Sequence, residues 1–346
     1  MTAPQTSESS ELGSGDDPGV ADVSGSVQRA RDLFSSDEIA QLIRPSRVQG
    51  LVLVGHCWLM ILGIWTLCVV FPHPLLWLVA IPLIGARQLG LAILNHDGAH
   101  YTLHPNKKLN DWVSEWLLNR PLFGDSVIGY RKYHLVHHRF TQQENDPDLH
   151  LSAKFPITRA SLRRKIWRDL SGQTGLKQYG NLVRSALSKG RIAHSSSGPN
   201  DVSTQVTGFW QRLGPNLVIN ALFLAGFAAA GAWYLYFVLW VLPAFTWERF
   251  ITRLRNIGEH AVVPDNDDRL RNTRTVVASW WERACIAPYF VNYHLEHHLL
   301  VSCPCYRLPQ AHAALIHKGY GPRMEVQRGY RRVLELATSV PEPTAA

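Results

Sequence analysis

Long uncharged apolar runs dominate the first third of the chain. Residues 51–71 carry no formal charge, and residues 74–95 continue in the same manner, interrupted only by Arg87 and Gln88. A helix needs about 20 apolar residues to cross the hydrocarbon core of a bilayer, so each run is long enough for one crossing. The short turn between them, around His73, predicts that the two crossings form a helical hairpin.

A second apolar region, residues 213–247, is too long for one crossing and has Gly231 near its middle. We interpret it as two crossings, 213–229 and 231–247, joined by a tight turn. The alternative is that these runs are helices buried in a protein core, which the near-zero mean hydropathy of the chain would suggest. Uncharged runs of this length favour crossings, and polar segments elsewhere lower the mean. The expected fold is an all-α integral membrane protein with four transmembrane helices in two hairpins.

The distribution of positive charge orients these crossings. Both turns, at 72–74 and 228–232, lack Lys and Arg, whereas residues 96–212 contain 17 of them. Loops rich in Lys and Arg stay on the cytoplasmic side, so both termini and residues 96–212 are expected there, with a helical cap. A net charge of +8 suits a surface beside anionic lipid. It needs no nucleic acid, for which the chain lacks a binding motif.

Three short motifs place histidines at helical spacing. They are HDGAH at 96–100, HLVHH at 134–138 and HLEHH at 294–298. Residues i, i+3 and i+4 lie on one face of an α-helix, so the histidines of each motif can point to one place. Three converging faces would gather eight imidazoles, those of His96, His100, His134, His137, His138, His294, His297 and His298.

Eight imidazoles exceed the four ligands of one zinc ion and suit two metal ions. Imidazole binds iron, copper, zinc and nickel, so the ligand type leaves the metal open. Each motif begins close to the end of an apolar run. The expected di-metal site therefore lies in the cap, at the cytoplasmic boundary of the membrane and within reach of a lipid chain.

A fourth motif, RNIGEHA at 255–261, supplies Asn256 and His260, again four residues apart. Alone, such a spacing is more often a surface pair. Its position directly after the fourth apolar run, at the same boundary as the other motifs, favours the interpretation as metal ligands.

Several acidic residues lie in or near the motifs. Asp97 and Glu296 lie on a different helical face from their neighbouring histidines, and Asp146 and Asp148 follow the second motif. They can orient a histidine from outside the ligand set or face solvent. His104 precedes a proline that ends the first helix, so it is not expected to be a direct ligand.

The two ends of the chain differ from its middle. Residues 1–30 are rich in Ser, Gly and Asp and cannot bury enough apolar surface to fold, which predicts a disordered tail. We expect one membrane domain over 31–320 and a C-terminal tail over 321–346.

With these motifs in this order, and with CYRLP at 305–309 after the last, residues 50–320 resemble bacterial members of the membrane fatty acid desaturase family. The resemblance implies a non-haem di-iron centre that uses O2, in a bacterial inner membrane with the site on the cytoplasmic side. It implies iron ligands at His96, His100, His134, His137, His138, His260, His294, His297 and His298, with Asn256 as a weaker or water-mediated ligand.

The motifs also depart from parts of that family. The first one has the spacing HxxxH, whereas the acyl-CoA branch has HxxxxH. The chain contains no HPGG-type haem-binding signature, so the two electrons are expected from a separate donor of ferredoxin or cytochrome b5 type.

The function implied by this resemblance is desaturation of a fatty acid or acyl lipid, in lipid metabolism. One alternative is a di-iron hydroxylase or ketolase acting on a carotenoid, sterol or alkane, since the same centre can insert oxygen. Another class is a histidine-rich metal or ion transporter, which should carry ionisable residues deep in its crossings, whereas here the motifs lie at the ends of the apolar runs. Acyl length, double-bond position and headgroup are not encoded in these motifs.

Overall fold

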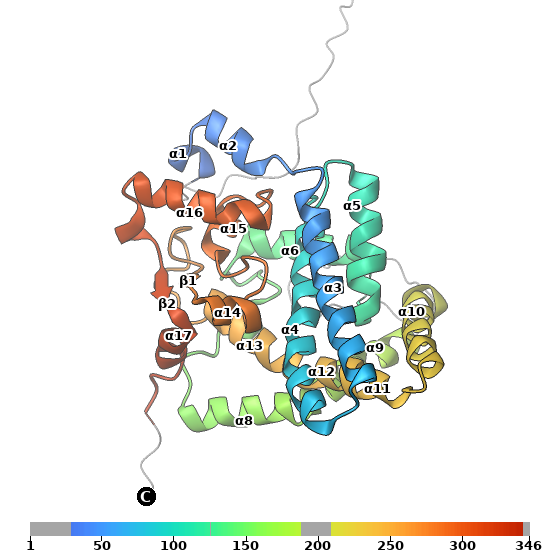
Figure 1. Cartoon of the computed structure of the whole chain (residues 1–346). Helices are drawn as coiled ribbons and strands as arrows, with labels where there is room; N and C mark the ends of the chain where they lie inside the picture. Colours follow the sequence, from blue (N-terminus) through green and yellow to red (C-terminus); the bar gives the residue numbers. More distant parts are fainter. Residues whose placement is uncertain (1–28, 125, 188–208, 342–346) are drawn as a thin grey trace, which may run out of the picture.

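The computed structural model describes residues 29–124, 126–187 and 209–341, and the chain there is mostly helical. The disordered tail expected over 1–30 lies almost wholly outside the described residues. Two long antiparallel helices, α3 (Gln49–Val70) and α4 (Pro74–Ala99), stand side by side in Figure 1. The turn between them is set by Pro74 at the first position of α4 and by His73, whose Nδ1 accepts from the Leu75 N–H. The first two apolar runs are therefore consecutive antiparallel helices, and their crossing of a membrane as a hairpin stays a prediction.

The second predicted hairpin is not confirmed. Helix α10 (Phe209–Ala229) ends in a turn at Gly231, where φ is +72°. The expected fourth crossing, 231–247, is instead a broken helix formed by α11 (Tyr234–Tyr236), the π-helix η3 (Phe237–Val241) and α12 (Leu242–Phe245). At 1.5 Å per residue, this stretch is about 18 Å long, well short of a bilayer core of about 30 Å.

Pro243 provides a physical reason for the break, because it has no N–H to donate and its ring clashes with the preceding turn. The chain leaves helical geometry at Thr246 and starts again as α13 (Trp247–His260). Among the described residues, three helices are long and apolar enough to cross a membrane, namely α3, α4 and α10.

The remaining helices are shorter than these three. Before α3 are α1 (Ala30–Leu33) and α2 (Ser36–Ile43). Between α4 and α10 are α5 (Lys107–Val113), the π-helix η1 (Ser114–Asn119), the 3-10 turn η2 (Arg120–Leu122), α6 (Val127–Phe140), α7 (Leu149–Ser152), α8 (Arg159–Leu170) and α9 (Gln173–Leu187). After α13 are α14 (Trp280–Cys285), α15 (His294–Leu299), η4 (Cys305–Arg307), α16 (Leu308–His317), η5 (Gly321–Arg323) and α17 (Gly329–Ala337).

The C-terminal part also contains the two described strands, so the fold is not purely helical. Strand β1 (Thr275–Val277) pairs in parallel with β2 (Val326–Arg328), and Val276 lies opposite Gln327. Helix α17 then buries Tyr330, Val333 and Ala337 against α13. Up to Ala337, the segment expected as a tail is therefore part of the packed structure, because its apolar residues recur at helical spacing.

The C-terminal half of α4 links the apolar helices to the C-terminal elements of the chain. Figure 1 shows these elements gathered on one side of the α3–α4 pair. From Ile84 to Ala99 every residue of α4 is buried except Ala92. Asn110 of α5 holds the end of this helix, because its Nδ2 donates to the Gly98 carbonyl at 2.8 Å. These contacts fix the position of the first histidine motif.

Candidate metal centre

Four helices bring the histidines together. His96 lies in the last turn of α4 and His100 caps it, while α6 carries His134, His137 and His138. His260 is the last residue of α13. Helix α15 contains the third motif, with His294, His297 and His298.

The nine predicted histidines form two groups. One contains five, His96, His100, His134, His138 and His297; the other contains four, His137, His260, His294 and His298. Within each group, one nitrogen from every ring lies within 4.8 Å of the others. The structure therefore places all nine predicted histidines in two arrangements that could each hold a metal ion.

The division between the groups follows helical geometry. Histidines at i and i+4 share a group, as His134 does with His138 and His294 with His298. The histidine at i+3 joins the other group, as His137 and His297 both do. Positions i and i+4 differ by about 40° around a helix and i+3 lies about 60° to the other side, so α6 and α15 each serve both groups.

Contacts between ring nitrogens fit shared metal ions. The Nε2 atoms of His134 and His138 are 2.9 Å apart, and those of His138 and His297 are 3.0 Å apart. In the second group, the Nε2 atom of His294 lies 2.9 Å from that of His260 and 3.1 Å from that of His298. Neighbouring ligands have such a spacing when each binds one ion at about 2.1 Å.

Burial supplies a second test of the fit. Nε2 of His96 and both ring nitrogens of His100 are buried without a hydrogen-bond partner among the described residues. An unpaired buried polar atom is costly, and a bound cation would satisfy it. Burial and neighbouring histidines lower the pKa of His138, His294 and His297 well below the ordinary range, which keeps the rings neutral as metal ligation requires.

Asp146 orients one histidine from outside the groups. Its Oδ1 lies 2.8 Å from Nδ1 of His137, so the Nε2 atom of that ring is left for the second group. The backbone N–H groups of Gln142 and Asp148 donate to the same carboxylate at 2.9 and 2.8 Å. Although burial opposes it, the hydrogen bond and charge of Asp146 raise the pKa of His137. A carboxylate–histidine pair of this kind fixes ligand orientation in metal sites.

Thr141 and Glu259 also lie behind the ligand groups, and neither was a predicted site residue. The Thr141 hydroxyl is 3.1 Å from Nδ1 of His298. Glu259 lies 3.6 Å from Nδ1 of His294, and its Oε1 accepts from Arg255 at 2.7 Å. Burial raises the pKa of Glu259 to about 7, against the opposing charge of Arg255.

The two acidic residues inside the motifs have other partners. Asp97 accepts from the Cys305 N–H at 3.0 Å and lies 3.8 Å from Nδ1 of His96. Glu296 accepts from His312 and Thr275. Both carboxylates are buried, so the solvent-facing alternative is wrong.

Asn256 and His104 differ from the nine clustered histidines. Asn256 lies one turn before His260 on α13 and is partly buried. Its role as a weaker ligand stays a prediction. His104 lies outside both groups, where its Nδ1 accepts from the Asn106 N–H at 3.0 Å.

Comparisons with known proteins found a matching family and a similar protein. The sequence model of the family described as fatty acid desaturase matches residues 72–327. The chain is also similar to the dihydrorhizobitoxine desaturase of Bradyrhizobium elkanii. The two sequences are 26% identical over 319 residues, which cover 89% of this chain and 83% of the relative.

Proposed function

Because the chain belongs to the fatty acid desaturase family, we propose that it is a membrane-bound, O2-dependent di-iron desaturase that introduces a double bond into an acyl lipid. The observation that carries this proposal is the division of nine buried or partly buried histidines into groups of five and four. The reaction would convert CH2–CH2, O2, two electrons and two protons into CH=CH and two water molecules.

The histidines of the two groups would hold two iron ions, which suit imidazole ligands. When bound, these ions would supply the activation of O2 that removes hydrogen from an unactivated chain. The protein itself contributes position and exclusion of water. Asp146 and Thr141 hold the ring planes of His137 and His298, so that their Nε2 atoms face inward.

The surroundings of the site support a chain-like, apolar substrate. His96 and His100 end a helix whose preceding residues are apolar and long enough to cross a membrane. A lipid chain could thus reach the metal groups without leaving apolar surroundings. Three such helices support a location in the inner membrane, and the Lys- and Arg-rich segment 96–212 favours a cytoplasmic site.

The proposal also includes an electron donor and a substrate class. A separate protein of ferredoxin or cytochrome b5 type would deliver the two electrons. The name of the Bradyrhizobium relative gives dihydrorhizobitoxine as its substrate and mentions no fatty acid. That name favours desaturation over oxygen insertion as the reaction type.

Two measurements test the proposal, one on the purified protein and one on the cells that make it. We expect about two irons per chain by plasma emission, and a new unsaturated chain by gas chromatography of lipids from cells that make the protein. Iron with a hydroxylated or ketone product would shift the conclusion to a hydroxylase or ketolase. A purified, folded chain that binds no iron under reducing conditions would refute the di-iron centre.

A further inference from the structure

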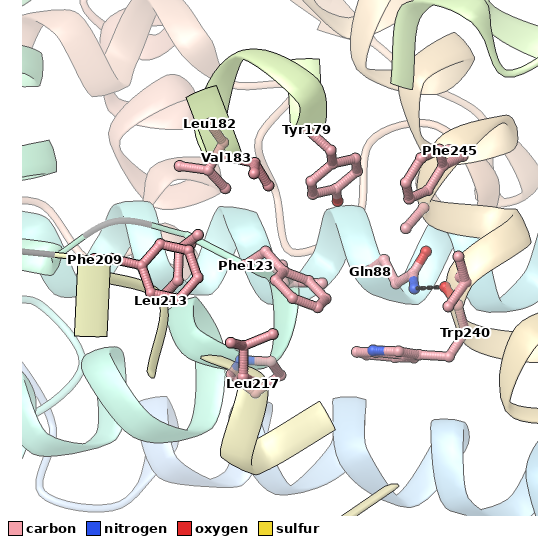
Figure 2. A pocket seen from close by; sticks show the side chains of 14 residues that line it. Gln88, Phe123, Tyr179, Leu182, Val183, Phe209, Leu213, Leu217, Trp240 and Phe245 are labelled. Carbon is pink, nitrogen blue, oxygen red and sulfur yellow. Dashed lines mark hydrogen bonds between the residues drawn. The ribbon is translucent and has the colours of Figure 1, made fainter. Parts of the chain in front are cut away.

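An apolar cavity lies beside α4, on the membrane side of the histidine groups. It has a volume of about 250 Å³ and is lined by residues of α4, η2, α9, α10, η3 and α12. Aromatic rings form much of its wall, and Figure 2 shows those of Phe123, Tyr179, Phe209, Trp240 and Phe245 around the open space. Such a shape and lining fit an apolar chain.

One buried polar group interrupts this apolar wall. Gln88 is fully buried, and its Nε2 donates to the Trp240 carbonyl at 2.8 Å. A carbonyl only accepts, so this bond fixes which end of the carboxamide is nitrogen. The other end, Oε1, is a buried acceptor with no hydrogen-bond partner in the described part of the chain. The indole N–H of Trp240 cannot serve it, because it donates to Asn220 Oδ1 at 3.0 Å.

The cavity wall and the first histidine motif share one helix, α4. Gln88, Ala92 and His96 lie at i, i+4 and i+8 on α4, so about 12 Å separates the first from the last along the axis. Ala92 is partly exposed although its neighbours on α4 are buried, and its small side chain leaves room beside the helix. A chain in the cavity could therefore extend past Ala92 towards His96.

We propose that this cavity binds the part of the substrate chain remote from the reacting carbons, and that this chain carries a hydrogen-bond donor, a hydroxyl or an N–H, for Gln88 Oε1. The assignment to the substrate rests on the proposed desaturase function. A plain alkyl chain would leave the acceptor desolvated and unpaired, whereas a donor-bearing chain pairs it. The site should therefore favour the donor-bearing chain by about tenfold.

Matched probes that differ only in the donor test this inference. The full-length, metal-loaded protein in lipid nanodiscs would be titrated with tritiated 1-dodecanol, with empty nanodiscs as the partition blank. Displacement by unlabelled 1-dodecanol is compared with displacement by dodecyl methyl ether, which keeps the oxygen but loses the donor. A second pair, N-dodecylacetamide and its N-methyl derivative, tests N–H in the same way.

Two variants separate the effect of Gln88 from membrane partitioning. Gln88→Met keeps a similar volume without an acceptor, and should reduce the donor preference about tenfold relative to the unmodified chain. Leu217→Met, in the same cavity wall, should leave the preference unchanged. Equal thermal midpoints and metal contents would show that both variants fold.

The outcomes distinguish this inference from the proposed function. The same donor preference in the unmodified chain and in Gln88→Met, for both probe pairs, would overturn the inference. If the Gln88-dependent preference is present but the probes do not inhibit turnover, the cavity is not part of the substrate site. Preference without any unsaturated product would instead overturn the proposed function, because probe binding is measured without turnover.

Discussion

His312 and Glu296 are joined behind the third histidine motif, with Nδ1 of His312 2.6 Å from Oε1 of Glu296. The other carboxylate oxygen of Glu296 accepts from the Thr275 hydroxyl at 2.5 Å. Glu296 is fully buried on α15, while His312 belongs to α16 and Thr275 to β1. The carboxylate thus holds α15 from the side opposite its metal-facing histidines.

This relationship predicts that Glu296 is required for stability and for the position of α15. Glu296→Ala leaves buried Thr275 without its partner and should lower the free energy of unfolding by roughly 2–4 kcal/mol. Glu296→Gln keeps the volume and one acceptor and should cost less. Thermal unfolding measures both, with Glu335→Gln as the control, because Glu335 pairs only with exposed arginines. An Ala variant as stable as the control would contradict the anchoring role.

Asp146 should control metal affinity rather than stability alone. Asp146→Asn keeps an acceptor for Nδ1 of His137 but removes the negative charge that raises the basicity of the ring. We expect iron affinity to fall by about 10–100-fold, the usual effect of removing such a partner. Competition with a chelator measures this. Asp148→Asn is the control, since Asp148 lies 4.0 Å from His137 and accepts from Tyr133. Equal affinities in the two variants would contradict the prediction.

A direct ligand should matter more than its supporting residues. His298→Ala removes one of the four imidazoles of its group. Iron affinity should fall further than in Asp146→Asn, for which we expect a loss of about 10–100-fold. His104→Ala should leave iron content unchanged, because that ring lies outside both groups. Iron per chain after gel filtration separates the two variants. Retention of two irons by His298→Ala would remove this residue from the ligand set.

Much of this centre follows from spacing in the sequence, because a helix fixes the face on which its residues lie. The histidine-bearing faces of α4, α6 and α15 could be predicted without knowing how the helices pack. The residues that contact these helices from behind could not, since His312 and Glu296 meet only when α16 packs on α15. Glu259, inside the NIGEH motif, could have been found, because it directly precedes His260.

The fold was predictable where a segment is long and regular. The helices α3 and α4 and the turn at Gly231 lie where the apolar runs predicted them. The prediction of one continuous helix over 231–247 was wrong, because hydropathy does not reflect the effect of Pro243 on helix geometry. Strand β2 pairs with β1, 51 residues earlier, and so short a non-local pairing leaves little signal in the sequence.

Metal removal should destabilise the whole assembly. The two histidine groups join α4, α6, α13 and α15, so bound ions cross-link four helices. Free metal at 100 times its dissociation constant contributes about 2.7 kcal/mol per site by mass action. Dialysis against a chelator should therefore lower the thermal midpoint, and added ferrous iron should restore it. A midpoint independent of metal would contradict occupancy of these groups in the folded state.

A buried asparagine on α10 should be essential for packing of the apolar helices. Asn220 Oδ1 accepts from the Trp240 indole at 3.0 Å and from the Tyr236 hydroxyl at 3.1 Å, and its Nδ2 donates to the Pro121 carbonyl at 3.3 Å. Asn220→Leu keeps the volume but leaves these groups unpaired in an apolar interior, which should lower stability by roughly 2–4 kcal/mol. Leu222→Ala, two residues away on the exposed side of the same helix, should change it little. Thermal unfolding in the same detergent compares the two, and equal midpoints would show that the Asn220 network adds no stability.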